Sequence, residues 1–444
     1  MHGNIQSLPK GTKMASSVAV IGAGIAGIQA ALDIANRGIL VHLIEREPSI
    51  GGHMAQLDKT FPTNDCSMCI LSPKMAEIAR HPFIQLHTCT IVDKIEGNVG
   101  NFTVTIRTIP RFIDESLCNG CGDCVRICPV EVYNRFDAGV GARKAIYKPQ
   151  TQAIPDIVIK DAEHCIECGL CYDVCDLDAI LKEDAEKILE FKVASIIIAV
   201  GYTVFDACRK EQYGYLRFPD VITSLELERM LNASGPTAGE LRRLSTGELP
   251  KSVLFIQCVG SRDIKVQRAY CSCVCCMYAI KNAILIKERY PETDVTICYQ
   301  DIRAYGKGYE EYYKRAESLG IRFLRGLPGS VDEGVERLSL QVENTETDEV
   351  LTLYPDLIVL SVGLDPAPDI EKLAKALGIP LEETGFMRPL DDTLGPVLTI
   401  RKGIYVAGTV TAPRDIPDSV TMGEAAAMKA VKDVLEAEAY EAAR

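Results

Sequence analysis

Two cysteine runs constrain this chain more than any other feature of its sequence. Each run reads C-x-x-C-x-x-C-x-x-x-C; the first starts at Cys118 and precedes Pro129, and the second starts at Cys165 and precedes Asp176. Paired runs of this kind are typical of two-cluster ferredoxins, in which the fourth cysteine of each run binds the other cluster, whereas zinc sites favour separated C-x-x-C pairs. The predicted 4Fe–4S ligands are Cys118, Cys121, Cys124 and Cys175 for one cluster, and Cys165, Cys168, Cys171 and Cys128 for the other.

The composition narrows the setting in which these cysteines act. The chain has 444 residues, of which 47% are hydrophobic and 25% charged, a balance typical of a globular protein. A net charge of −13 argues against nucleic-acid binding, and the apolar runs are shorter than the ~20 residues of a membrane span. The first residues contain no apolar segment of the secretory type. We therefore expect a cytoplasmic protein whose 18 cysteines serve metal or redox chemistry.

A glycine-rich turn follows the first predicted strand. Gly22, Gly24 and Gly27 form a G-x-G-x-x-G pattern that opens a helix. A second strand at 41–44 ends at Glu45, near the position of the acid that binds a dinucleotide ribose. If the turn bound nothing, the position of Glu45 would be a coincidence. The carboxylate of Glu45 would also repel the 2′-phosphate of NADP. The pattern therefore predicts a site for FAD or NAD rather than NADP.

Later segments repeat the pattern of a predicted buried strand followed by glycine. They lie at 193–201, 357–363 and 403–410, and a long helix follows from about Ser419. This order resembles the flavoproteins of the thioredoxin-reductase type, which have two dinucleotide-binding domains. The resemblance implies bound FAD, with the last segment closing over the flavin, although Thr409 stands where that family usually has Asp. The implied flavin contacts are Gly408 and a helix N-terminus at Asp418, Ser419 and Val420.

The second dinucleotide-binding domain should begin with another glycine fingerprint, and there the sequence departs from the pattern. The strand at 252–257 leads into C-V-G-S-R-D, and the single Gly260 cannot form a phosphate cradle. Cys258 stands at the strand end, and C-S-C-V-C-C-M-Y-A-I-K-N-A follows from Cys271. We therefore expect a metal centre in place of a pyridine-nucleotide site.

These cysteine motifs also carry a more specific resemblance. Together with D-I-R-A-Y-G-K-G-Y-E-E-Y-Y at 301–313 and D-I-P-D-S-V at 415–420, they resemble the A subunit of heterodisulfide reductase and its bacterial relatives, over about residues 17–430. The resemblance implies that the extra N-terminal domain and C-terminal ferredoxin of the larger archaeal proteins are absent here. It also implies a third 4Fe–4S cluster, held by Cys258, Cys271, Cys275 and Cys276.

Three features near these motifs have open interpretations. Cys273 stands where Arg is common in the family and is a fifth candidate ligand, but ligands packed into 271–276 would wrap poorly around a cube, so Cys258 is preferred. The resemblance places Lys281 between cluster and flavin, where a cation near N5 stabilises the reduced form; the alternative is a solvated helix lysine. Cys66 and Cys69 form a further C-x-x-C, interpreted as a redox dithiol, as ligands of a cluster shared with a partner, or as buried thiols.

Taken together, these features predict an α/β, thioredoxin-reductase-like flavoprotein with an inserted two-cluster ferredoxin domain. The expected cofactors are FAD and three 4Fe–4S clusters. The predicted division is a first FAD-binding part at 17–110, the inserted domain at 111–187, a return strand and hinge of the FAD domain at 188–250, a degenerate NAD-type domain with a cluster at 251–370, and a second FAD-binding part at 371–444.

The leading hypothesis is an electron-transfer component of a heterodisulfide-reductase-like complex, and the resemblance implies electron bifurcation. Implied partners are proteins like the B and C subunits of heterodisulfide reductase, a hydrogenase-linked electron-transfer protein or dehydrogenase subunits, around a dimeric core. One alternative is a self-contained disulfide reductase that uses Cys66 and Cys69. Another is a binding subunit whose clusters are structural.

Overall fold

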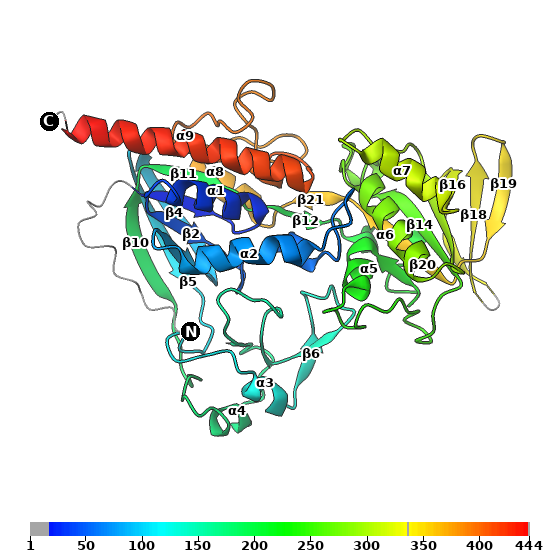
Figure 1. Ribbon diagram of the computed structural model, residues 1–444, viewed down its shortest axis with the longest axis horizontal. Helices are drawn as coiled ribbons and strands as arrows, with labels where there is room; N and C mark the ends of the chain where they lie inside the picture. The colour runs from blue at the N-terminus through cyan, green and yellow to red at the C-terminus, as the bar shows by residue number, and fades with distance from the viewer. Residues whose placement is uncertain (1–16, 335–336, 443–444) are drawn as a thin grey trace.

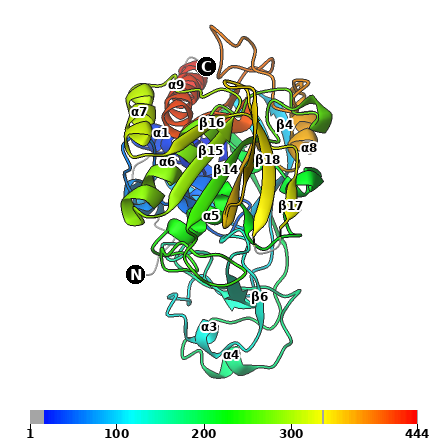
Figure 2. The same cartoon turned by 90° about the vertical axis from the view of Figure 1, so that its right-hand side faces the viewer.

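The computed structural model describes residues 17–334 and 337–442 and has three lobes (Figure 1). One parallel sheet lies on the left of Figure 1 and a second lies on the right, and a smaller lobe with few regular elements lies below them. Figure 2 shows the same small lobe, with β6, α3 and α4, projecting away from both sheets.

The first sheet is parallel throughout and has the strand order β22-β11-β1-β2-β3. Every residue of β1, β2 and β11 is buried, as expected for a parallel sheet that is covered on both faces. Its strands are β1 (Val18–Ile21), β2 (Val41–Ile44), β3 (Ile84–His87), β11 (Ser195–Ile198) and β22 (Ile404–Val406).

Helices cover one face of the first sheet and an antiparallel sheet covers the other. The covering helices are α1 (Ile25–Ala35), α2 (Ser67–Arg80) and α9 (Ile416–Ala442), which share one apolar core with the sheet. The opposite face packs against β4 (Thr90–Asn98), β5 (Asn101–Thr108), β10 (Lys187–Val193) and α8 (Ile370–Leu377). Figure 1 shows α9 lying along α1 at the outer edge of this layer.

The second sheet repeats this arrangement, with the parallel order β13-β20-β14-β15-β16. Its strands are β13 (Val221–Thr223), β14 (Ser252–Val259), β15 (Asp294–Tyr299), β16 (Arg322–Arg325) and β20 (Leu357–Val362). Helices α5 (Ser224–Leu231), α6 (Cys275–Arg289) and α7 (Tyr309–Ser318) cover one face. Strands β17 (Val331–Glu333), β18 (Leu338–Asn344) and β19 (Glu349–Leu353) form the antiparallel sheet on the other face. The pair β12 (Tyr202–Val204) and β21 (Leu364–Pro366) joins the two halves.

The inserted lobe is built from short elements around a small core that includes Ile113, Ile146, Val158 and Ile180. These elements are α3 (Asp123–Ile127), β6 (Glu131–Tyr133), β7 (Ala142–Lys144), β8 (Ile146–Tyr147), β9 (Ile159–Lys160) and α4 (Leu170–Asp173). Several predicted cluster cysteines pack against this core. A lobe with so little regular structure depends for its folding stability on the groups that its cysteines bind.

Some element boundaries differ from those expected from the sequence. Strand β13 and helix α5 belong to the second sheet, although the sequence places the segment 188–250 with the first, because β13 pairs in parallel with β20. Helix α9 begins at Ile416, ahead of the expected Ser419, and β14 continues through Cys258 to Val259. No helix within 17–334 and 337–442 has both the length and the apolarity needed to cross a membrane.

Candidate functional site

A cavity of about 1240 Å³ lies where the three lobes meet. The first sheet contributes Gly24 and Glu45 to its lining, the inserted lobe contributes Arg143, and the second sheet's helices contribute Glu228 and Lys281. The volume exceeds the range of about 300–1,000 Å³ that is usual for small-molecule sites, so there is room for a large cofactor. This cavity is therefore the candidate site.

The turn between β1 and α1 forms one end of the cavity. Gly22 has φ +99°, and a Cβ there would lie 2.3 Å from the carbonyl oxygen of Ala199, so another residue cannot be accommodated. Gly24 lines the cavity and faces open space, which lets a phosphate approach the backbone at the N-terminus of α1. Gly27 packs against the Gly22 carbonyl outside the lining, as the close contact of helix and strand requires.

Glu45 is held in place at the end of β2. Its carboxylate accepts hydrogen bonds from the backbone N–H groups of Ala23 (2.7 Å) and Glu47 (2.9 Å), and the residue is 9% exposed and lines the cavity. Burial raises the pKa of Glu45, and the two backbone hydrogen bonds oppose that rise. The carboxylate is thus positioned where a ribose of a bound dinucleotide would lie.

The C-terminal segment lines the cavity beside this turn, since a Cβ at Gly408 would lie 2.9 Å from the Cβ of Ala26 in the first turn of α1. Gly408 and Thr409, in the short 3-10 turn Gly408–Val410, line the cavity together with Ser419. Asp418 is exposed and, like Val420, lies outside the lining, whereas Ile416 and Pro417 at the start of α9 line the cavity together with Ser419. The neighbouring Arg414 lines the cavity, and its buried Nε has no hydrogen-bond partner among the described residues. An anionic or oxygen-rich group such as a flavin dinucleotide fits these donors.

The four cysteines predicted for the third cluster come together at the end of the second sheet. Cys258 adopts φ +60° at an irregularity in the pairing of β14 with β20, and α6 begins with Cys275 and Cys276. Burial raises the pKa of Cys275, and the nearby thiols of Cys258, Cys276 and Cys271 raise it further. Four convergent thiols form the soft donor set that iron–sulfur clusters require.

Cys273 lies at the edge of this group. Its backbone N–H donates to Cys271 Sγ at 3.3 Å, and the pKa of Cys271 falls to about 6 chiefly because Cys273 hydrogen-bonds to it. The groups that act most strongly on Cys273 are Cys271, Tyr305 and Arg303. This placement favours Cys273 as a neighbour of the Cys271 ligand position rather than as a ligand.

The cysteines of the inserted lobe gather in the two predicted sets. Burial raises the pKa of Cys124 to about 12, and Cys118, Cys121 and Cys175 add to that rise because they lie close by. A separate small pocket has in its lining the whole of the second predicted set, Cys128, Cys165, Cys168 and Cys171. Each remote fourth cysteine thus lies with the three cysteines of the other run.

Lys281 extends from α6 into the cavity and is only 1% exposed. Its ammonium group forms an ion pair with Glu228 of α5 and donates to the carbonyl oxygen of Lys59 at 3.0 Å. The alternative of a solvated helix lysine is therefore wrong. Sequence reasoning missed Glu228, because the segment S-L-E-L-E-R-M-L reads as an ordinary amphipathic helix and nothing local marks this glutamate as buried.

Cys66 and Cys69 form a disulfide at the start of α2, with their Cα atoms 5.2 Å apart. Cys66 caps the helix, since its sulfur accepts the backbone N–H of Cys69. Cys69 is exposed, and the flanking Asp65 and Ile70 line the cavity. Of the three interpretations, the redox dithiol is the one that this bond favours.

Comparison with known proteins agrees with this architecture. Residues 17–67 match the family described as FAD dependent oxidoreductase, and residues 117–180 match the 4Fe-4S dicluster domain. Thioredoxin reductase of Lactococcus lactis has a similar fold, with a TM-score of 0.52 and 19% identity over 95% of this chain and 99% of that one. T. acidophilum thioredoxin reductase also has a similar fold, with a TM-score of 0.52 and 15% identity over 95% of this chain and 100% of that one. The predicted fold class is confirmed, and the fold and matched regions define an iron–sulfur flavoprotein of the oxidoreductase type.

More specific relatives cover most of the chain. The chain is 53% identical over 414 residues to the iron-sulfur A subunit of CoB–CoM heterodisulfide reductase from Methanocaldococcus jannaschii, covering 93% of this chain and 63% of that protein. It is 48% identical over 421 residues to the A subunit of H2:CoB-CoM heterodisulfide,ferredoxin reductase from Methanothermobacter marburgensis, covering 94% and 64%. The chain is thus similar over nearly its whole length to heterodisulfide reductase A subunits, and it spans somewhat less than two thirds of the length of these relatives.

Proposed function

We propose that this chain is an electron-transfer subunit that links FAD to three 4Fe–4S clusters within a heterodisulfide-reductase-like complex. One observation carries the proposal: the cavity runs from the glycine turn at Gly24 to α6, where Val274 and Tyr278 line it beside Cys275 and Cys276. A dinucleotide in that cavity would end next to four convergent thiols. Bound FAD would supply two-electron uptake with release in single steps, and each cluster carries one electron.

The chain's own residues have separate tasks in this proposal. The turn at Gly22 and Gly24 receives the pyrophosphate on backbone N–H groups, and Glu45 accepts from the ribose hydroxyls. Gly408, Ser419 and the N-terminal turn of α9 face the pyrimidine edge, with Asp418 and Val420 behind them.

Lys281 holds a positive charge inside the cavity, and Glu228 positions it. A buried cation at the flavin ring favours the negatively charged reduced state, because the low dielectric strengthens the attraction. The task assigned to this pair is to set the flavin potential.

The metal centres follow the cysteine sets. We assign one cluster to Cys118, Cys121, Cys124 and Cys175, one to Cys165, Cys168, Cys171 and Cys128, and one to Cys258, Cys271, Cys275 and Cys276.

The domain division proposed from the sequence is kept, except that β13 and α5 join the second sheet. The proposal extends to a cytoplasmic location, a dimeric core, and partners that resemble the other subunits of heterodisulfide reductase, a hydrogenase-linked protein or a dehydrogenase. Bifurcation is proposed on the family relationship alone.

An anaerobic reduction assay tests this function. The purified, cluster-replete chain is mixed with NADH, NADPH, dithionite or reduced ferredoxin, and flavin bleaching is followed. We expect dithionite and ferredoxin to bleach the flavin and the nicotinamides to have negligible effect, because the second sheet lacks a phosphate cradle. Rapid bleaching by NADH without any partner would replace the proposal with an NAD-linked reductase.

A second candidate function is a flavin-dependent disulfide reductase, and the Cys66–Cys69 bond is the observation that favours it. Alkylation separates the two functions. A catalytic dithiol gains label only after reduction, and activity disappears with labelling. An electron-transfer subunit keeps dithionite-dependent cluster reduction when Cys66 and Cys69 are both replaced by Ser.

A further inference from the structure

The inserted lobe forms one wall of the flavin cavity, and a group of its polar side chains has no task in the function proposed so far. Arg143 of β7, Tyr147 of β8 and the loop residues Asp161, Glu163 and His164 all line that cavity. Arg143 is the cation of this group, and its side chain is only 14% exposed.

Arg143 is held in one orientation from two sides. Its Nη2 donates to Asp161 Oδ2 at 2.6 Å and its Nη1 donates to the carbonyl oxygen of Lys144 at 3.1 Å. Its guanidinium carbon lies 3.9 Å from the centroid of the Tyr147 ring, which is a cation–π stack. The guanidinium has five N–H donors, and these contacts leave some of them free to face the cavity.

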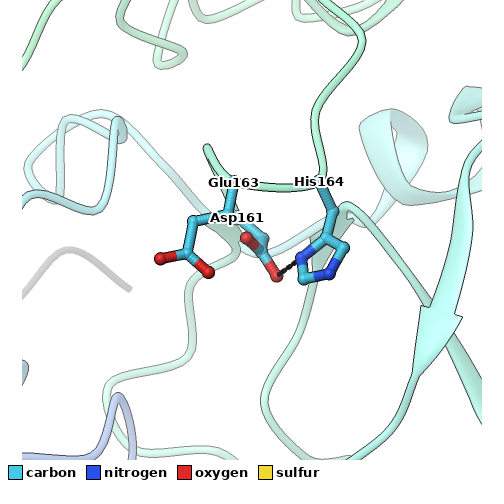
Figure 3. A group of neighbouring side chains, drawn as sticks. All are labelled: Asp161, Glu163 and His164. Carbon is cyan, nitrogen blue, oxygen red and sulfur yellow. Dashed lines mark hydrogen bonds and ion pairs between the residues drawn. The ribbon is translucent and has the colours of Figure 1, made fainter.

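Asp161 is itself oriented by His164, whose Nδ1 lies 3.0 Å from Asp161 Oδ2; Figure 3 shows this contact with Glu163 alongside. The ligand atoms of Asp161, Glu163 and His164 lie within 4.8 Å of one another, a spacing that suits a metal ion. Arg143 already binds and neutralises the Asp161 carboxylate, however. The task that fits Asp161 is to position Arg143.

The stack of Arg143 on Tyr147 lies beside the end of β2. Burial raises the pKa of the Tyr147 hydroxyl, and Glu47 contributes to that rise because it lies nearby. The backbone N–H of Glu47 binds the carboxylate of Glu45, which marks the ribose position of the dinucleotide site. The stack therefore borders the adenosine end of the cavity.

We propose that Arg143 of the inserted domain binds the adenosine diphosphate half of FAD, with Asp161 and Tyr147 as its positioning residues. This inference rests on the proposed FAD site. The glycine turn offers the diphosphate only backbone N–H groups, whereas Arg143 adds the remaining N–H donors of a charged guanidinium, arranged as a fork. A cofactor held by both the first sheet and the inserted domain couples flavin binding to the order of the cluster domain.

Flavin titration tests the proposal. Cluster-replete protein is deflavinated anaerobically, and the wild type, Arg143→Gln and Arg143→Lys are each titrated with FAD, ADP and riboflavin, beginning with FAD on the wild type. We expect Arg143→Gln to bind FAD and ADP roughly 10- to 100-fold more weakly and riboflavin unchanged, because a charge-assisted hydrogen bond is lost. Arg143→Lys, which keeps the charge without the fork, should fall between.

The neighbouring Lys144 provides a matched control. It lies on the same strand and pairs with Glu131 outside the cavity lining, so Lys144→Gln should bind FAD and ADP like the wild type. Asp161→Asn, which frees Arg143, should weaken FAD binding less than Arg143→Gln does. FAD should also slow hydrogen exchange of the inserted domain in the wild type and do so less in Arg143→Gln.

Two results would overturn the inference while leaving the proposed function intact. One is an Arg143→Gln protein that binds FAD and ADP as tightly as the wild type. The other is an equal loss of affinity for riboflavin, which would indicate general damage to the cavity. A wild-type protein that binds no FAD would overturn the proposed function itself, and the inference with it.

Discussion

The two parallel sheets of this chain have the same order of strands and helices, but different residue types follow their central strands. In each, a central strand, β1 or β14, is followed by a helix, α1 or α6, and then by a parallel neighbour, β2 or β15. The first strand reaches its helix through Gly22, Ala23 and Gly24, and the second through a long loop that carries Cys271 and Cys273. One layered scaffold can thus position either a phosphate cradle or a thiol donor set at the carboxyl ends of its strands.

Removal of one thiol from the second sheet should have the largest effect of the changes considered, because a whole cluster depends on it. Cys276→Ala should lose about four of the 12 iron atoms expected per chain, because three thiols hold a cubane poorly. Iron and acid-labile sulfide are measured on anaerobically purified protein. Cys273→Ala is the matched control and should keep its iron; loss of a cluster in Cys273→Ala instead would reassign the ligand set.

The corresponding change in the first sheet is Gly22→Ala. A Cβ at this position meets the Ala199 carbonyl oxygen at 2.3 Å and forces a non-glycine residue to φ +99°. Backbone strain alone costs about 1–3 kcal/mol, and we expect the purified protein to lose FAD. Flavin absorbance per chain and urea unfolding measure the two effects. Gly329→Ala, where a Cβ would meet nothing within 4 Å, should leave both unchanged.

The ion pair between Lys281 and Glu228 lies within the second half of the molecule and contacts the first half through the backbone of Asp58 and Lys59. Lys281→Met leaves the buried Glu228 carboxylate without its cation, with only the backbone N–H of Asp58 as a donor among the described residues, and should reduce the free energy of unfolding by about 3–5 kcal/mol. Adding Glu228→Gln should recover much of that stability. The flavin midpoint potential should fall in Lys281→Met, because the cation is gone and the Glu228 carboxylate remains in the cavity lining; an unchanged potential would place Lys281 away from the flavin.

The smallest expected effect is a pH dependence of the free energy of unfolding that arises from two histidines of the first sheet. Burial lowers the pKa of His42 on β2 to about 3 and that of His87 on β3 to about 4, from an ordinary 6.5. The folded state then binds fewer protons than the unfolded state, so this stability is present above pH 6.5 and is lost as pH falls towards 4. Each group contributes up to about 1.4 kcal/mol per pH unit in that window.

Urea unfolding at pH 7 and pH 5.5 measures this dependence. His87→Phe should flatten it, since one of the two titrating groups is gone and an aromatic ring still lies near Phe191. A pH dependence as steep in His87→Phe as in the wild type would contradict the assignment.

Features set by local spacing could be predicted from the sequence. The turn at Gly22 and Gly24 and the two cysteine runs specify their own geometry within a few residues, so the fold class and the cysteine groupings followed from them. Features set by packing between distant segments could not. Glu228 meets Lys281, and β13 joins β20, only through the tertiary arrangement. The inward turn of Ser419 depends on where α9 starts, which the sequence located three residues too late.

The number of iron atoms per chain decides whether the second sheet carries a cluster. We predict about 12 iron atoms with matching sulfide in anaerobically purified protein, as three cubanes of four require. A value near eight would contradict this prediction, because the second sheet would then hold no cluster and its cysteines would be without their assigned task. A value near sixteen would instead assign Cys66 and Cys69 to a further cluster completed by another chain.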